Sequence, residues 1–559
     1  MRGRVVIIAL ALAAVAIAYA ASGSGGEHGE QERPRATAAP TAAADAVHVA
    51  LVYSPEKRSL LAPLIKRFNA QRLTSGGRPV TVDATVVPSG DAETRIAEGT
   101  LRPVLWSPAS SFWGRLLNYE ADRALAPDEN PSIVRTPLVI AMWKRLADAY
   151  GYPRRPLGYR HLGELATGGW AAVGKPQFGA FKYVHTNPDF STAGLSAVAA
   201  SYYAAVGKRE GLTQADVARG RDQVRRLERS IVHYGDTTLF ISDEMRRRGL
   251  GYASAAAMEE TTLIDFNRRA GDGERLVAVY PEEGTFESDN PLITLRGTWV
   301  EPHQQRAAKV FAAFLADAVT PEAAGRHGFR PADRDDEPAG LVSTDLGVDP
   351  AQPERVLSLP EPRVLARIRS AWRADRKPAR VMMVFDNSAS MGGEDKLERA
   401  RAALKGFFRR AGRQDHIGLM KFSSDITTLV PIGPIRANRA KLLAAADTIL
   451  PDEDTRVRDA TIAGVEAVEA KLDRDMINAV VVLTDGQDTA SARTGYDVVK
   501  ELEAQGRRES GQIRVFTIAY GREANEDELA KYAEASGGKT YKGGTDEIAS
   551  VYRSISSFF

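Results

Sequence analysis

The stretch VMMVFDNSASM, residues 381–391, decides the fold of the last third of the chain. Its first five residues are apolar and predict a strand that is buried on both faces, as in a parallel sheet covered by helices. Asp386, Ser388 and Ser390 follow this strand and bring one carboxylate and two hydroxyls at alternate positions. Polar groups at the end of a buried strand are costly unless something binds them. Oxygen ligands of this kind suit a hard divalent cation such as Mg²⁺.

Two further stretches carry side-chain oxygens toward the same point. VVVLTDG, residues 480–486, predicts a second buried strand that ends at Asp485, and Thr455 follows an acidic run just ahead of an Ala-rich helical run. Ligands of an open parallel α/β sheet bind at the carboxyl ends of its strands. All three segments are expected to reach that edge. Together they resemble the von Willebrand factor type A (VWA) domain and its metal-ion-dependent adhesion site (MIDAS).

The resemblance implies a Rossmann-like, doubly wound α/β domain over residues 380–559 and a specific set of metal ligands. It implies that Ser388 and Ser390 ligate Mg²⁺ or Mn²⁺ directly, with Thr455 as a further ligand, and that Asp386 and Asp485 act directly or through water. One coordination position is left for an acidic group of a partner. The chain departs from the family in one place, because Asp454 precedes Thr455 where glycine is usual.

Length and composition limit the remaining possibilities. A chain of 559 residues exceeds one ordinary hydrophobic core, so we expect two or three domains. The formal net charge of +2 gives no argument for nucleic acid as a partner. The absence of cysteine excludes disulfides, zinc thiolate sites, cysteine nucleophiles and a lipid-modified cysteine anchor.

The N-terminus predicts export. Arg2 and Arg4 precede an apolar run that ends at residue 21. Residues 1–21 fit a secretory signal peptide with a small-residue cleavage site at 18–20, and they also fit one short transmembrane anchor that leaves the domains outside the cell. The lack of a cysteine for a lipid tether favours the anchor. Residues 22–46 are rich in Gly, Ala, Pro and charge and predict a disordered spacer.

Residues 47–331 alternate strand and helix patterns and predict a second α/β region. Three of its segments resemble bacterial extracellular solute-binding proteins of the two-lobed, periplasmic-binding-protein-like type. They are NPDFSTAG at 187–194, YPEEGTF at 280–286, and a C-terminal helix pair with AAKVFAAFL at 307–315 and GFRP at 328–331. The resemblance implies two lobes with a ligand cleft between them.

Hydroxyl groups at expected helix starts are the candidate ligand contacts of this cleft. Free N–H groups and the helix dipole favour an anion or a polar ligand at such positions. The candidates are Ser54, Ser110, Ser111, Ser191 and Thr192, with Tyr280 reaching in from the crossover segment. Serine and threonine cap helices everywhere, so each hydroxyl also has a purely structural explanation.

Residues 332–379 predict a turn-rich linker with one helix. Val364, Ile368 and Trp372 lie on one face of that helix, which we expect to pack onto the last domain.

The chain contains no nucleotide-binding, serine-hydrolase or zinc-protease motif, so catalysis is disfavoured and no catalytic residue is assigned. The favoured hypothesis is an exported, membrane-anchored binding protein. In it, the VWA domain captures a carboxylate of a protein or cell-envelope partner, and the solute-binding region serves as a sensing or docking module for a small solute. The alternatives are a transport receptor that uses the VWA domain as a scaffold, and a metal-loading or assembly factor.

Overall fold

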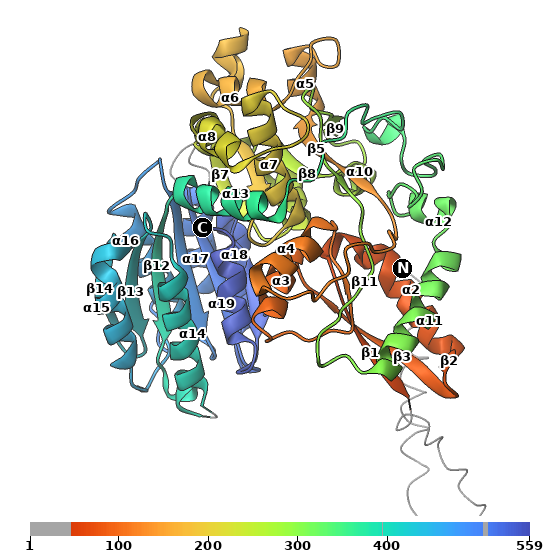
Figure 1. Ribbon diagram of the computed structural model, residues 1–559. Helices are drawn as coiled ribbons and strands as arrows, with labels where there is room; N and C mark the ends of the chain where they lie inside the picture. The colour runs from red at the N-terminus through yellow and green to blue at the C-terminus, as the bar shows by residue number, and fades with distance from the viewer. Residues whose placement is uncertain (1–45, 394, 507–511) are drawn as a thin grey trace, which may run out of the picture. The chain divides into compact units, whose positions relative to one another are not determined.

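Three β-sheets organise the residues that the computed structural model describes, which are 46–393, 395–506 and 512–559 (Figure 1). All three sheets lie in one compact unit, Val47–Phe559. The expected signal peptide or anchor and nearly all of the expected spacer lie outside the described residues. Within the described ranges, no helix is both long enough and apolar enough to cross a membrane.

The first sheet forms one lobe of the solute-binding region. Its strand order is β11-β4-β1-β3-β2, and β1 pairs in parallel with both β3 and β4. The strands are β1 (Val47–Tyr53), β2 (Thr74–Ser75), β3 (Arg78–Val86), β4 (Leu105–Ser107) and β11 (Ile293–Thr294). Its helices are α2 (Arg58–Gln71), α3 (Ser89–Ala97), α4 (Phe112–Ala121) and α11 (Pro302–Ala318).

The second sheet forms the other lobe, with the order β10-β5-β8-β6-β7 and with β9 also paired to β5. Its strands are β5 (Thr136–Trp143), β6 (Tyr183–Thr186), β7 (Ile231–Gly235), β8 (Ala255–Glu259), β9 (Leu276–Val279) and β10 (Glu287–Ser288). Its helices are α5 (Lys144–Tyr150), α6 (Tyr159–Gly168), α7 (Thr192–Val206), α8 (Gln214–Glu228), α9 (Thr238–Arg248), α10 (Glu260–Arg269) and the short α12 (Pro321–Gly325). The chain passes between the lobes from α4 to β5, from β10 to β11 and from α11 to α12, which gives the two-lobed arrangement that the sequence predicts.

The third sheet has the order β14-β13-β12-β15-β16-β17 and is parallel except for the edge pair β13–β14. Its strands are β12 (Ala379–Asp386), β13 (His416–Phe422), β14 (Ile426–Pro434), β15 (Ile477–Thr484), β16 (Ile513–Tyr520) and β17 (Thr540–Gly543). Its helices are α14 (Lys396–Arg410), α15 (Ile435–Asp447), α16 (Val457–Glu469), α17 (Gly495–Gly506), α18 (Glu526–Ser536) and α19 (Ile548–Ser556).

Both faces of β12 are buried, because alternate side chains of a strand point to opposite faces. Val381, Met383 and Phe385 pack with residues of α14, α15 and α19, whereas Met382 and Val384 pack with residues of α16, α17 and α18. The sheet is therefore covered by helices on both sides, which confirms the doubly wound α/β prediction.

The helix of the expected linker, α13 (Pro362–Asp375), packs mainly against α8, α4 and α7 of the solute-binding region. The expectation that it packs onto the last domain is therefore wrong. Its apolar face, which includes Val364, Ile368 and Trp372, is covered by those helices, and the indole N–H of Trp372 donates a hydrogen bond to Glu228 at 3.1 Å.

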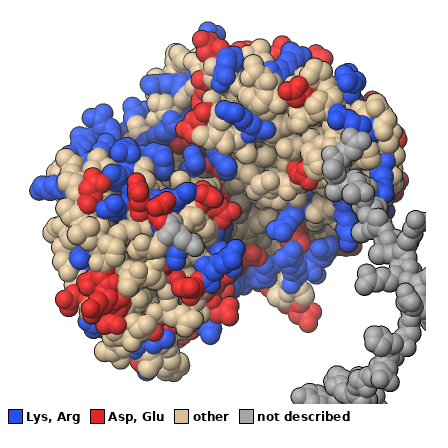
Figure 2. Space-filling model, turned by 90° about the horizontal axis from the view of Figure 1, so that it is seen from below, with Lys and Arg blue, Asp and Glu red and all other residues tan. Residues whose placement is uncertain are grey.

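Charged side chains of both signs are interspersed over the face that Figure 2 shows, as expected for a chain with 74 basic and 72 acidic residues.

A candidate metal site and a candidate ligand cleft

The five residues expected to bind a metal lie at the carboxyl edge of the third sheet. Asp386 is the last residue of β12, and Asp485 follows β15 directly. Thr455 lies two residues before α16. Asp386, Ser388, Thr455 and Asp485 are all buried, at 5% exposure or less.

Hydrogen bonds join the side chains of three of these residues. The Oγ atoms of Ser388 and Ser390 are 3.1 Å apart, and Ser390 Oγ donates to Asp485 Oδ1 at 2.6 Å. Asp386 accepts a hydrogen bond from the backbone N–H of Ser388 at 2.7 Å and one from the hydroxyl of Thr484. These contacts orient the loop so that the serine hydroxyls lie beside the Asp485 carboxylate.

Thr455 lies close to the same group. A methyl group placed on Gly486 would lie 3.4 Å from Ser390 Oγ and 3.7 Å from Thr455 Oγ1. Both hydroxyls therefore lie near the same point beside Gly486, although they come from two distant segments. The backbone of Thr455 is held there, because its N–H donates to Thr489 Oγ1 and its carbonyl accepts from the N–H of Thr489, both at 2.9 Å.

Burial raises the pKa of Asp386 to about 6, and the nearby Asp485 carboxylate adds to this effect. A cation held close to Asp386 would favour the charged form of its carboxylate and offset part of this desolvation penalty.

The donor set consists of two carboxylates and three hydroxyls. No group of three or more His, Cys, Asp or Glu residues suited to a metal is found in the described part of the chain. The remaining candidate ligands among these five residues are therefore hydroxyl oxygens. An all-oxygen set fits a hard divalent cation such as Mg²⁺ or Mn²⁺ better than a soft one.

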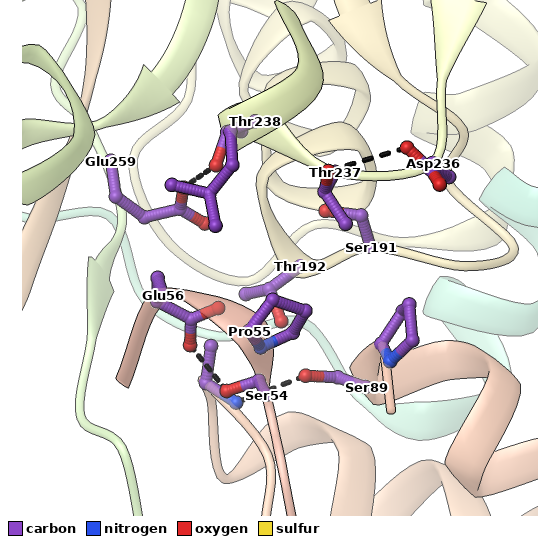
Figure 3. Close-up of a pocket in the computed structure, with 13 residues that line it drawn as sticks. Ser54, Pro55, Glu56, Ser89, Ser191, Thr192, Asp236, Thr237, Thr238 and Glu259 are labelled. Carbon is purple, nitrogen blue, oxygen red and sulfur yellow. Dashed lines mark hydrogen bonds between the residues drawn. The ribbon is translucent and has the colours of Figure 1, made fainter. Parts of the chain in front are cut away.

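The cleft between the two lobes narrows to a cavity of about 20 Å³ that residues of both lobes line (Figure 3). Ser54, Glu56 and Ser89 line it from one lobe, and Thr238 and Glu259 face them from the other. A space of this size holds about one water molecule. The cleft between the two lobes is therefore closed. A solute larger than water can enter only after the lobes separate.

The sequence predicts six hydroxyl groups at the cleft. Three of them line this cavity, and three do not. Ser54, Ser191 and Thr192 line it. Two of them already have partners, because Ser54 Oγ accepts from Lys57 Nζ at 2.6 Å and Thr192 Oγ1 accepts from Trp113 Nε1 at 2.8 Å.

Ser110, Ser111 and Tyr280 do not line the cavity. Ser110 Oγ faces the amide of Phe112 at the start of α4, and the backbone N–H of Ser111 donates to Asp289. The hydroxyl of Tyr280 is turned inward to Glu260, which Arg330 also binds at 2.7 Å. These three residues serve the local packing of the lobes.

The acidic lining of the cleft was not expected from the sequence. Glu56, Asp236 and Glu259 all border the cavity. Burial, and then the neighbouring Glu56, raise the pKa of Glu259 to about 7. Glu259 and Glu260 are adjacent in sequence but have different partners, Thr238 for Glu259 and Arg330 for Glu260. Periodicity gives no sign that one of them would face a cleft.

A buried lysine supports one wall of the cleft. Lys57 Nζ donates to the carbonyl of Pro108 at 3.0 Å and to Asn290 Oδ1 at 2.9 Å, in addition to Ser54. Burial, opposed by Glu56, lowers the pKa of Lys57 to about 8. This amino group fixes the turn that presents Ser54 and Glu56 to the cavity.

Comparisons with known proteins agree with this architecture. The family model "bacterial extracellular solute-binding protein" matches residues 49–330, which is half of the chain, and the model "von Willebrand factor type A domain" matches residues 381–549. A search among curated proteins finds no significant match. Both matched families are binding or adhesion domains rather than enzyme families.

Solved structures of both kinds resemble parts of the chain. A periplasmic thiamin-binding protein is 12% identical over 59% of this chain and 96% of its own, with a TM-score of 0.42. A von Willebrand factor type A protein from Catenulispora acidiphila is 16% identical over 33% of this chain and 42% of its own, with a TM-score of 0.30. Proximal thread matrix protein 1 from the mussel byssus, solved with a zinc-occupied MIDAS motif, is 15% identical over 32% and 46% of the two chains, with a TM-score of 0.27. The two family models confirm both resemblances noted in the sequence: the chain belongs to the bacterial extracellular solute-binding protein family and carries a von Willebrand factor type A domain after its solute-binding region.

Proposed function

We propose that this is an exported, membrane-anchored binding protein whose VWA domain binds an acidic group on a protein or cell-envelope partner through Mg²⁺. Residues 1–21 are its anchor or signal and 22–46 its spacer. The solute-binding region spans 47–331 and the VWA domain spans 380–559, with 332–379 between them. The solute-binding region is the sensing or docking module.

One observation carries the proposal. Ser388, Ser390 and Asp485 come from segments almost a hundred residues apart and form one hydrogen-bonded group at the carboxyl edge of the sheet. Asp386 and Thr455 border this group. A purely structural turn has no need of five oxygen-bearing side chains at one buried point, because polar groups removed from water are unfavourable without a partner.

The five residues of the site would have different roles in binding the ion. Ser388 and Ser390 would offer hydroxyl oxygens to the ion with Thr455, and Asp386 and Asp485 would balance its charge. Bound Mg²⁺ would supply positive charge and an open position for a carboxylate of the partner. Hydroxyl ligands are neutral, so two protein carboxylates leave the ion electrophilic toward a third.

The proposal is tested by titrating the full chain with Mg²⁺ in a calorimeter and by measuring its binding to immobilised poly-glutamate. We expect Mg²⁺ binding, and poly-glutamate binding that EDTA abolishes. Asp485→Asn should weaken both at least tenfold, whereas Asp527→Asn, at an exposed position in the first turn of α18, should change neither. Poly-glutamate binding that persists in EDTA would refute the mechanism.

The closed cleft favours a second candidate function, that of a receptor for a small solute. The lining by Glu56, Asp236 and Glu259 favours a solute with ammonium or other hydrogen-bond donor groups over an anion. A panel of small cations, neutral polar solutes and anions, screened by thermal shift, tests this candidate. A rise in melting temperature with the cations alone would support it, and stabilisation by anions alone would contradict it.

A further inference from the structure

A large groove lies at the opposite end of the VWA strands from the metal site. Its volume is about 1220 Å³, and it is bordered by the amino ends of β6 and β7 of one lobe and of β15 and β16 of the VWA domain. Seven of the residues that line it are Arg or Lys, and one is Glu. Asp386 and Asp485, by contrast, lie at the carboxyl ends of their strands.

Arg514, the second residue of β16, is the key residue of this groove. It is 2% exposed. Its Nη2 donates to Gln512 Oε1 at 3.0 Å, and its Nε has no hydrogen-bond partner within the described part of the chain. Burial lowers the pKa of Arg514 to about 10; the neighbouring Arg248 adds to this effect, and Tyr252 and Glu244 oppose it. A buried guanidinium with an unused donor is unfavourable unless an acceptor arrives from outside.

Further cations border the same groove. Lys377 Nζ donates to the carbonyl of Ile231 at 3.0 Å, and Arg248 Nε lies 3.1 Å from Glu244. Glu244 is already shared, because Arg247 also binds it. Arg229 and Arg474 lie on the exposed rim. The acidic groups around the groove therefore leave it with an excess of positive charge.

We propose that this groove binds an organic anion that carries two or more phosphate or carboxylate groups. Arginine matches both groups with paired N–H donors, and a desolvated arginine gains most from such a partner. Phe178, Phe181 and Leu250 line part of the wall and give the carbon body of the ligand a surface to pack on. The groove exceeds the usual size of a small-ligand pocket, so it has room for an extended ligand as well as a small one.

The ligand class differs from that of the other two sites. The VWA metal site takes a carboxylate through a cation, and the interlobe cleft is lined with acids. The groove takes anions directly on arginine, so its occupancy needs no divalent ion. This independence separates a test of the groove from a test of the metal site.

The test uses the full chain in EDTA and two probes, inorganic tripolyphosphate and citrate, with binding measured by calorimetry at low and at physiological salt. We expect at least one probe to bind, with an affinity that falls as salt rises. Binding of tripolyphosphate alone identifies a phosphate-bearing ligand, and binding of citrate alone identifies a carboxylate-bearing ligand. If neither probe binds, the proposal is overturned.

Variants locate the binding. Arg514→Met should weaken it at least tenfold, and the rim double variant Arg229→Gln with Arg474→Gln should weaken it several-fold without touching the core. Arg436→Gln, at an exposed position on α15 away from the groove, is the matched control and should leave it unchanged. Unaltered affinity in both groove variants would overturn the assignment.

The melting temperature without ligand gives a separate readout. Arg514→Met should leave it unchanged or raise it, because a buried charge that has no ion-pair partner of its own is removed. A clear loss of stability would mean that Arg514 serves the fold instead of a ligand.

Discussion

Lys396 places its ammonium group 2.8 Å from Oδ2 of Asp485, within the group that would hold Mg²⁺. A fixed positive charge beside a divalent ion opposes binding of that ion. We therefore expect Lys396→Gln to lower the apparent Kd for Mg²⁺ by about tenfold, equivalent to about 1.4 kcal/mol. Calorimetric titration with Mg²⁺ measures this change.

The matched control for Lys396 is Lys441→Gln, at an exposed position on α15. It should leave the Kd unchanged. If Lys396→Gln weakens Mg²⁺ binding instead, the ammonium group supports the site rather than competing with the ion.

Glu93 gives the protein a pH-dependent stability. It is fully buried on α3, and burial raises its pKa to about 7, with Arg369 opposing and Glu120 adding to the shift. The folded state thus holds a proton that the unfolded chain, with a pKa near 4.5, releases. The stability that this proton provides is complete below about pH 4.5 and is lost as the pH rises through about 7.

Melting temperatures at about pH 5.5 and about pH 8.5 test this linkage. The unmodified chain should lose stability toward the higher pH, and Glu93→Gln should lose less, because glutamine stays neutral throughout. Glu129→Gln, at an exposed position, should keep the pH dependence of the unmodified chain. If the melting temperatures of the two variants fall equally between these pH values, Glu93 is ionised over this whole range.

At the scale of single residues, the position of a functional side chain could be predicted from the sequence where it follows a recognisable strand at a fixed spacing. Asp386, Ser388 and Ser390 follow a buried strand at fixed spacing, so their place at the sheet edge follows from the strand alone. Glu56, Asp236 and Lys396 belong to no such pattern. Their roles depend on which segments the tertiary fold brings opposite them.

Helix α13 ties the two lobes of the solute-binding region together. Arg369, 2% exposed, reaches Glu93 of α3 at 3.4 Å, Glu120 of α4 at 2.8 Å and Asp189 of the other lobe at 3.0 Å. Although burial opposes it, the charges of Arg369 and Arg373 hold the pKa of Asp189 below its usual value. One guanidinium thus spans the closed cleft.

Removal of this guanidinium should open the cleft. Arg369→Ala removes the shared partner of three acidic side chains, so we expect a loss of about 3–5 kcal/mol of stability and a larger radius of gyration as the lobes separate. Thermal unfolding and small-angle scattering measure the two effects. Arg367→Ala, at an exposed position on the same helix, is the control and should show neither.

The sequence predicts that α13 exists but not where it packs. Val364, Ile368 and Trp372 define one apolar face of the helix. Their spacing does not indicate which helices that face packs against. The packing position of α13 depends on the ion pairs of Arg369 and on the hydrogen bond of Trp372 to Glu228. Both residues have their partners far away in the chain. Periodicity gives the elements of this protein, whereas long-range pairing of charges decides how they assemble.

At the scale of the whole unit, the VWA domain contacts the lobe that carries β6 and β7. Phe558 packs edge-on against Phe240 of α9, with ring centroids 5.1 Å apart, and the side-chain amide of Asn187 donates to the carbonyl of Ser557 at 3.1 Å. Lys539 and Tyr541 of the VWA domain both reach the carboxylate of Asp236. Because Asp236 also lines the interlobe cleft, the docked domain and the cleft share a residue.

This interface predicts that the two regions unfold together. Phe240→Ala, a change on the solute-binding side, removes a ring that is 8% exposed and that contacts Phe558 across the interface. Its loss should cost about 3–5 kcal/mol and separate the single thermal transition into two, because the VWA domain would no longer be held by its neighbour. Scanning calorimetry, with tyrosine fluorescence as a second probe, follows both regions.

The control is Tyr496→Ala. Tyr496 is 74% exposed on α17, and its removal should leave one transition at its original temperature. If Phe240→Ala also unfolds in a single step, the remaining contacts, such as those of Lys539 and Tyr541 with Asp236, are enough to couple the two regions.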